Sequence, residues 1–421
     1  MSLSTGPAAY RPRLADRRLA ELLGTFSAVL INGPRAVGKT TTARQVAASV
    51  VRLDDPGEAA AFEADAGAAL RLQREPVLLD EWQEVPALLG AVKRAVDDDP
   101  RPGRFILTGS VRGEVEQRVW PGTGRLLRMA MYGLTHAELQ GAAGDHRPGF
   151  LEQLALADPA AISTPAQQPD LVGYIALAVR GGFPDVVLRQ LEARERNAWL
   201  DSYVGNLLTR DARAVDPRRD AMKMRAYFEA LALSTGGMPQ EKTLADAAGI
   251  DVKTARSYDR LMEELFVTEQ IPAWSTNRLS RLVHTPKRYI VDSGLAARAA
   301  RVTEEAILRD GDLLGRTIDS FAVAQLRPEV AASPDRYRAH HLRTQGGRQE
   351  VDLVVELDSD RVLALEFKAT AAPSRQDARH LIWLRDELGE RFVAGAVMHT
   401  GPRVFQLAER ILAVPLCAMW P

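Results

Sequence analysis

The sequence predicts an α/β protein whose amino-terminal part contains a parallel β-sheet. Three short apolar runs, at residues 28–31, 77–79 and 105–107, indicate the strands. Uninterrupted runs of this length are typical of strands buried on both faces, as in a parallel sheet covered by helices. Each run leads directly into polar or glycine residues, which carry the chemistry of the predicted site.

The first run leads into a phosphate loop. Residues 33–40 read Gly-Pro-Arg-Ala-Val-Gly-Lys-Thr, a complete G-x-x-x-x-G-K-[ST] motif, and a helix is expected over 41–51. A strand that enters such a loop and continues as a helix lays backbone N–H groups around phosphates, at the positive end of the helix dipole. The motif therefore predicts binding of a nucleoside triphosphate with Mg²⁺, and the family resemblance described below implies that this nucleotide is ATP. The predicted nucleotide-binding residues are Gly33, Pro34, Arg35, Ala36, Val37, Gly38, Lys39, Thr40 and Thr41.

The second run supplies the acids that this motif needs for hydrolysis. Asp80 and Glu81 directly follow the buried run. Lys39 is expected to contact the β- and γ-phosphates, while the Thr40 hydroxyl and Asp80 are expected to hold Mg²⁺. Glu81 is expected to polarise the attacking water. ATP hydrolysis is therefore predicted to require all four residues.

The third predicted strand, residues 104–110, ends in hydroxyl side chains, so Thr108 or Ser110 is a candidate contact to the γ-phosphate or the water. With the phosphate loop, the paired acids and a later Gly124-Arg125 pair, the sequence resembles the AAA+-type ATPases of a widespread prokaryotic family. In that family the ATPase is fused to a carboxyl-terminal domain of unknown function 4143. The resemblance implies that Thr108 acts as sensor 1 and Arg125 as a sensor or finger arginine, which a neighbouring subunit of a homo-oligomer could supply.

Length and composition predict a multidomain intracellular protein. The chain has 421 residues, of which 54 are Lys or Arg and 55 are Asp or Glu, so its net charge is −1. Any nucleic-acid binding must therefore come from a local basic patch. Cys417 is the only cysteine, which points to a reducing compartment. No apolar stretch approaches the roughly 18 residues that span a bilayer, so we expect a cytoplasmic protein without membrane contact.

A helical bridge and a helix-turn-helix are expected in the middle of the chain. Residues 141–170 have the composition of a linker, and a helix is expected over 188–213, with an aromatic stripe that favours packing over chemistry. Residues 244–254 then show a helix, a Gly turn and a second helix that Asp251 caps and that runs to about Leu265.

Basic residues on and after this second helix predict a winged helix that contacts DNA, which is favoured over RNA. Arg256, Tyr258 and Arg260 lie on the helix itself. The expected wing carries Asn277, Arg278, Arg281, His284, Lys287 and Arg288. The alternative is that this module serves only packing or oligomer contacts.

The carboxyl-terminal region contains a predicted hairpin with acids on one face. Residues 350–357 and 361–368 each read as a strand, and a compact turn joins them. A turn centred on Ser359 places Asp352 opposite Glu366, with Cβ atoms about 5 Å apart. Two carboxylates this close repel each other unless a proton or a cation lies between them, and a divalent metal is the natural cation.

The pattern Asp…Glu-x-Lys in this geometry resembles the core of PD-(D/E)xK nucleases. The resemblance implies that Asp352 and Glu366 hold Mg²⁺ and that Lys368 orients or activates water. Asp319, on the predicted helix 313–326, is a candidate additional acid, although the family more often has Glu there. The alternative is an ordinary ribbon with cross-strand ion pairs, Glu350 to Lys368 and Glu366 to Arg343 or Arg348.

Together these patterns predict four regions: an AAA+-like ATPase domain over 1–140, a linker and helical bridge over 141–224, a winged helix over 225–300 and a restriction-endonuclease-like α/β domain over 301–421. Three functions remain open. The chain is an ATPase whose nucleotide state controls a carboxyl-terminal half that acts on nucleic acid, or a nucleotide switch in a toxin-like or defence setting with an inactive nuclease-like domain, or an assembly module with a structural ATP site.

Overall fold

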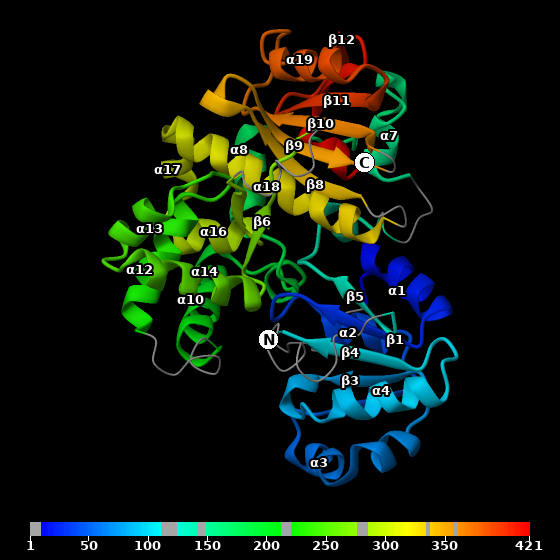
Figure 1. Cartoon of the computed structure of the whole chain (residues 1–421). Coiled ribbons are helices and arrows are strands. Elements are labelled where there is room, and N and C mark those ends of the chain that lie inside the picture. The colour runs from blue at the N-terminus through cyan, green and yellow to red at the C-terminus, as the bar shows by residue number, and fades with distance from the viewer. Residues whose placement is uncertain are drawn as a thin grey trace, which may run out of the picture. The chain divides into compact units, whose positions relative to one another are not determined.

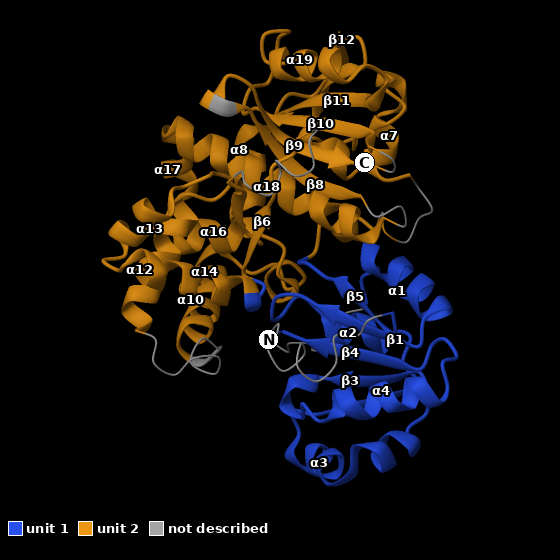
Figure 2. Ribbon diagram, in the orientation of Figure 1, with its two compact units in different colours: residues 1–133, 264–266 blue, residues 134–263, 267–421 orange. Residues whose placement is uncertain are grey.

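The computed structural model describes residues 10–110, 124–141, 143, 148–211, 220–275, 285–333, 337–357 and 360–421. The chain forms two compact units, which Figure 2 colours separately. Unit 1 comprises residues 1–133 and 264–266, and unit 2 comprises residues 134–263 and 267–421. The finer division into four regions stays a prediction.

Unit 1 contains a five-stranded parallel sheet in the order β2-β3-β4-β1-β5 (Figure 1). The strands are β1 (Ala28–Asn32), β2 (Ser49–Arg52), β3 (Val77–Asp80), β4 (Phe105–Gly109) and β5 (Leu126–Ala130). The helices are α1 (Leu14–Thr25), α2 (Lys39–Arg44), α3 (Pro56–Arg71) and α4 (Leu88–Asp98).

Helices cover both faces of this sheet. In β1, Val29 and Ile31 pack in the cluster that contains α1 and α2, whereas Leu30 packs in the cluster that contains α3 and α4. Every residue of β1, β3 and β4 is buried. The three apolar runs in the sequence are therefore strands, as predicted.

The helix predicted over residues 41–51 is wrong in its second half. The helix α2 ends at Arg44, and residues 49–52 form the edge strand β2, in which Val51 pairs with Leu79 of β3 and is 2% exposed. Two adjacent valines favour a strand because their branched side chains fit a pleated surface better than a helix.

The first part of unit 2 is helical. It contains α6 (His136–Leu139), α7 (Phe150–Leu154), α8 (Leu171–Arg180), α9 (Pro184–Val187) and α10 (Ala193–Asn206), which continues as a π-helical turn over Leu207–Asp211. The helix expected from residue 188 begins five residues later because Gln190 has a left-handed φ of 51°. Trp199 and Tyr203 pack against Phe183, which confirms packing as the role of the aromatic stripe.

A three-helix module with a β-hairpin follows. It consists of α12 (Ala221–Leu233), α13 (Glu241–Ala247), α14 (Val252–Glu264), β6 (Thr268–Ile271) and β7 (Lys287–Ile290). The two strands pair antiparallel. Asp251 caps α14 as predicted, because its carboxylate accepts hydrogen bonds from the backbone N–H and the hydroxyl of Thr254.

The β6–β7 hairpin does not expose all of the basic residues that were predicted to form the wing. Lys287 and Arg288 are only 2% and 8% exposed, and Tyr258 on α14 is also buried. Arg288 forms an ion pair of 2.6 Å with Asp259 of α14. Acidic partners inside the fold thus hold these residues away from any external phosphate. The remaining wing residues, Asn277, Arg278, Arg281 and His284, lie outside the described residues.

The chain ends in a six-stranded mixed sheet of order β12-β13-β11-β10-β9-β8. Its strands are β8 (Arg338–Arg343), β9 (Glu350–Glu356), β10 (Val362–Phe367), β11 (Phe392–His399), β12 (Phe405–Ala408) and β13 (Ile411–Pro415). The helices α16 (Ser293–Ala299), α17 (Glu304–Arg309) and α18 (Gly311–Ala332) precede it, and α19 (Arg379–Leu388) lies between β10 and β11.

The two longest of these helices pack on opposite faces of this sheet. Phe321 of α18 shares a buried cluster with Leu353 and Leu365, whereas Leu381 of α19 shares another with Val354. The strands β9 and β10 pair antiparallel with Leu365 opposite Leu353, which is the register predicted for a turn centred on residue 359.

The buried Arg288–Asp259 pair yields a stability prediction. Arg288→Met leaves the Asp259 carboxylate without its counter-charge, so the free energy of unfolding should fall by about 3 kcal/mol. The matched control is Arg256→Met, which removes the 61% exposed partner of Glu241 in the same module and should change stability by less than about 0.5 kcal/mol. Denaturant unfolding of both variants checks this, and equal effects would contradict it.

Candidate functional site

The phosphate loop joins the carboxyl end of β1 to α2, and its backbone geometry depends on two glycines. Gly38 has a left-handed φ of 96°. A Cβ atom on Gly33 would lie 2.1 Å from the carbonyl oxygen of Met131. Since no side chain fits that distance, Gly33 is required for the loop to pass the end of β5.

Lys39 lies inside this loop. Its ammonium donates hydrogen bonds to the carbonyl oxygens of Gly33, at 2.9 Å, and Pro34, at 2.8 Å, and the residue is only 7% exposed. Burial lowers the pKa of Lys39 to about 8, against an opposing effect of the Glu81 carboxylate. A phosphate that replaced the two carbonyls would restore the ammonium's full charge.

Asp80 accepts hydrogen bonds from two hydroxyl groups. The Thr40 Oγ1 donates to Asp80 Oδ1 at 2.7 Å, and the Thr108 Oγ1 donates to the same oxygen. The parallel pairing of β4 with both β1 and β3 brings the three side chains together at the carboxyl ends of the strands. Carboxylate and hydroxyl oxygens are suitable ligands for Mg²⁺, so Thr40 and Asp80 fit the ion that the sequence motif implies.

Glu81 lies directly beyond β3 in a left-handed backbone conformation, with φ 54° and ψ 51°. Its carboxylate accepts a hydrogen bond from the side-chain amide of Gln83. The amide holds the carboxylate in one orientation near the strand end, next to Asp80. Arg35 of the phosphate loop similarly donates to Ser110 Oγ, at 3.2 Å, so the third strand contacts the loop through Ser110.

Arg13 supports the loop, and the sequence analysis did not identify it. Its guanidinium donates hydrogen bonds to the carbonyl oxygens of Val37, at 3.0 Å, of Tyr132, at 2.7 Å, and of Gly133, at 3.1 Å. Arg13 therefore ties the phosphate loop to the segment that follows β5. A single arginine before a helix carries no motif, so no sequence signal marked it.

Arg125 lies away from this arrangement. It directly precedes β5, which pairs parallel with β1, so it is at the amino-terminal edge of the sheet while the phosphate loop is at the carboxyl-terminal edge. Its guanidinium is half exposed and forms an ion pair of 2.6 Å with Asp97 of α4. This position speaks against contact with the nucleotide of the same chain, and a role in a neighbouring subunit stays a prediction.

A second cluster of predicted residues lies in unit 2. Asp352 and Asp319 are brought together, and the ammonium of Lys287 bridges them at 2.9 Å from Asp352 Oδ1 and 3.1 Å from Asp319 Oδ2. Glu366 instead pairs with Lys368 at 2.9 Å. The alternative ion pair between Glu350 and Lys368 is therefore wrong. The Glu350 Oε2 atom instead lies 3.8 Å from the Arg343 Nε atom.

The charges in this cluster depend on one another. Burial and the neighbouring Asp352 carboxylate raise the pKa of Glu366 well above its usual value. Burial also raises the pKa of Asp319, to about 6. For Asp352 the same effect of burial is outweighed by Lys287 and Lys368, which lower its pKa. Across the part of the chain that the structure describes, no group of three or more His, Cys, Asp or Glu residues is arranged to hold a metal ion.

The chain matches three family models. An AAA domain matches residues 25–140, a domain of unknown function (DUF8612) matches residues 172–306, and a domain of unknown function (DUF4143) matches residues 314–419. The AAA and DUF4143 matches are those expected of an AAA-type ATPase with a carboxyl-terminal DUF4143 domain, which confirms the resemblance seen in the sequence. The AAA domain indicates a nucleotide-binding ATPase.

Two mycobacterial proteins are similar to this chain over most of its length. They are the uncharacterized proteins Rv2008c of Mycobacterium tuberculosis and Mb2031c of Mycobacterium bovis. Each is 28% identical over 409 residues, which cover 96% of this chain and 83% of the relative.

Among the described residues, none of the helices has both the length and the apolar character to cross a membrane.

The lowered pKa of Lys39 predicts a pH-dependent affinity for ATP. In the free protein the ammonium loses its proton as the pH rises through about 8, whereas bound phosphates hold that proton. The Kd for ATP should therefore rise by up to about tenfold per pH unit above pH 8. Calorimetric titrations between pH 7.5 and 9.5 measure this, with Lys93→Met, which removes an exposed lysine of α4, as the control that should keep the wild-type slope. A constant wild-type Kd across this range would contradict the assignment.

Proposed function

We propose that this protein is a Mg²⁺-dependent ATPase whose nucleotide state controls a carboxyl-terminal half that binds nucleic acid. The observation that carries the first part is the meeting of Thr40, Asp80 and Thr108 beside the buried Lys39. A phosphate loop, a hydroxyl, a strand-end carboxylate and a sensor hydroxyl are the parts that phosphoryl transfer to water requires.

Each residue of the site has a distinct task in hydrolysis. The loop amides and Lys39 bind the β- and γ-phosphates, with Lys39 exchanging its two carbonyl contacts for phosphate oxygens. Thr40 and Asp80 hold Mg²⁺, which when bound neutralises charge that develops on the phosphate oxygens. Glu81, oriented by Gln83, accepts a hydrogen bond from the attacking water and takes up its proton.

Substitutions in unit 1 test the ATPase. Lys39→Ala should abolish ATP binding, and Glu81→Gln should lower kcat by about 10²- to 10³-fold while ATP still binds, because only the base is lost. Glu84→Gln is the matched control, since Glu84 is an exposed carboxylate three residues further on and should keep the wild-type rate. Phosphate release and ATP binding are measured in parallel. Full activity of the Lys39→Ala protein would refute the proposal.

The second part of the proposal is supported by the order of elements in unit 2. The helices α12, α13 and α14 followed by the β6–β7 hairpin have the element order expected of a winged helix, which supports this part of the proposal. The segment from α18 through β8, β9 and β10 to α19 and β11 has an antiparallel triplet followed by a parallel strand, with Asp352 and Glu366 on neighbouring strands. This arrangement resembles the nuclease-like fold that the sequence predicts.

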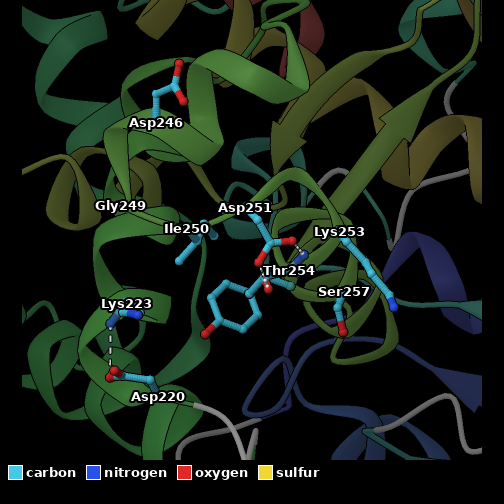
Figure 3. A pocket seen from close by; sticks show the side chains of 10 residues that line it. Asp220, Lys223, Asp246, Gly249, Ile250, Asp251, Lys253, Thr254 and Ser257 are labelled. Atoms are coloured by element: carbon cyan, nitrogen blue, oxygen red, sulfur yellow. Dashed lines mark hydrogen bonds between the residues drawn. The ribbon is translucent and has the colours of Figure 1, made fainter.

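The exposed side of α14 offers the contact surface for nucleic acid. The first turns of this helix border a hollow of about 990 Å³, in which Lys253 and Ser257 lie on the same side of the helix (Figure 3). Three aspartates, Asp220, Asp246 and Asp251, line the rest of the hollow against Lys223 and Lys253. The hollow itself is therefore not basic, and phosphate contacts fall to the exposed arginines further along α14.

Charge removal on α14 tests nucleic-acid binding. The double variant Arg256→Ala and Arg260→Ala removes two exposed cations, so it should weaken binding of duplex DNA and reduce the slope of log K against log salt by about 2. The control is Arg309→Ala, which removes a 77% exposed arginine of α17 outside the winged-helix elements. Fluorescence anisotropy at several salt concentrations measures both, with duplex RNA as a second ligand. An unchanged salt slope in the double variant would count against this surface.

A second candidate function is a nucleotide-dependent switch whose nuclease-like domain is catalytically inactive. The observation in its favour is Lys287, whose ammonium lies between Asp319 and Asp352, where a nuclease would hold its metal ion. The two candidates differ in one measurement. A nuclease-linked ATPase should nick DNA in the presence of Mg²⁺ and lose that activity in Lys368→Ala, whereas the switch should bind without cleavage.

A further inference from the structure

The strand β7 carries a lysine into a cluster of carboxylates on other elements. The ammonium of Lys287 lies 3.1 Å from Asp319 of α18 and 2.9 Å from Asp352 of β9, and 3.4 Å from the backbone carbonyl of Asp352. Lys287 is 2% exposed. All three hydrogen-bond acceptors of the Lys287 ammonium are thus oxygen atoms, like the ligands of a bound metal cation.

The cluster contains three acidic side chains, Asp319, Asp352 and Glu366, which are buried or nearly buried. Lys287 contacts both aspartates, and Lys368 contacts one oxygen of Glu366. The other oxygen, Glu366 Oε1, is buried and accepts no hydrogen bond from any residue that the structure describes. Glu366 is 2% exposed, so this oxygen is a buried polar atom that a bound cation would satisfy.

A hollow of about 440 Å³ opens beside these groups. Lys287, Asp319, Asp352 and Lys368 all line it, together with the backbone of Gly236 and Gly237. Solvent and ions therefore have a route to Asp319 and Asp352. The Lys287 ammonium lies between these two aspartates.

We propose that Lys287 is an internal cation that closes a divalent-metal site of Asp319, Asp352 and Glu366. In the closed structure the three carboxylates are not arranged around one metal ion, and they converge on one only when β7 withdraws. The proposal builds on the nuclease-like fold of the carboxyl-terminal sheet and does not depend on ATP hydrolysis. According to this proposal, a lysine of the chain itself closes the metal site.

The contacts of β7 explain how withdrawal is controlled. On the face that carries Lys287, the Tyr289 hydroxyl donates to Asp319 Oδ1 at 2.9 Å, and the Arg327 guanidinium lies 5.0 Å from the centre of the Tyr289 ring. On the other face, Arg288 binds Asp259 of α14. A displacement of the three-helix module would therefore act directly on the strand that holds the lysine.

Metal titration of the full-length chain tests the proposal. All proteins carry Asp80→Asn and are free of nucleotide, so that the phosphate-loop site does not contribute. Lys287→Met should bind one additional Mn²⁺ ion per chain, at least about tenfold more tightly than the protein with Lys287, because a divalent ion then neutralises the carboxylates. Adding Asp352→Asn should abolish this binding. Lys242→Met, an exposed lysine on α13, is the matched control and should bind as the parent does.

Thermal unfolding with and without Mn²⁺ provides the second readout. Mn²⁺ should raise the Tm of the Lys287→Met protein and leave the parent unchanged, since only the variant has an open site. If Lys287→Met does not fold, Lys287→Met with Asp319→Asn removes one charge of each sign and keeps Asp352 and Glu366 as ligands. Equal Mn²⁺ binding with and without Lys287, or binding that persists after Asp352→Asn, would overturn the proposal. Neither result would bear on the ATPase.

Discussion

The candidate site of unit 1 converges on one carboxylate oxygen, Asp80 Oδ1, which accepts hydrogen bonds from Thr40 and Thr108. Those residues come from three segments that are distant in the sequence, and the order β3-β4-β1 places their ends side by side. The strands are buried on both faces, so a shift in register would move apolar side chains out of two packed layers. The packing of the sheet thus fixes the geometry of the site.

Unit 2 depends on an analogous constraint, the alternation of side chains along β7. Lys287 and Tyr289 face α18 and the carboxyl-terminal sheet, whereas Arg288 faces α14. Each cation meets a buried aspartate, and neither could be turned to solvent without leaving that aspartate unpaired. A four-residue strand therefore joins the three-helix module to the carboxyl-terminal sheet. The same contacts make the acid cluster sensitive to the position of the hairpin.

Local sequence was misleading where the tertiary environment decided the outcome. The valines of β2 were expected in a helix because a helix follows the phosphate loop, but pairing with β3 drew them into the sheet. Lys287 and Arg288 were expected in an exposed wing because they follow other basic residues. Basic residues near a hairpin are ordinarily solvated, and only the aspartates of α14, α18 and β9 made their burial favourable.

The sequence by itself determined the parallel sheet, the phosphate loop with Lys39 and Thr40, the acids Asp80 and Glu81, and the register of β9 against β10. These features rest on short apolar runs, fixed motif spacing and a compact turn, which are properties of neighbouring residues. Only the tertiary structure placed Arg13 beneath the loop, Arg125 at the far edge of the sheet and Lys287 between two aspartates. Those positions arise from contacts between residues far apart in the chain, and no local pattern encodes which distant carboxylate or carbonyl a buried cation will meet.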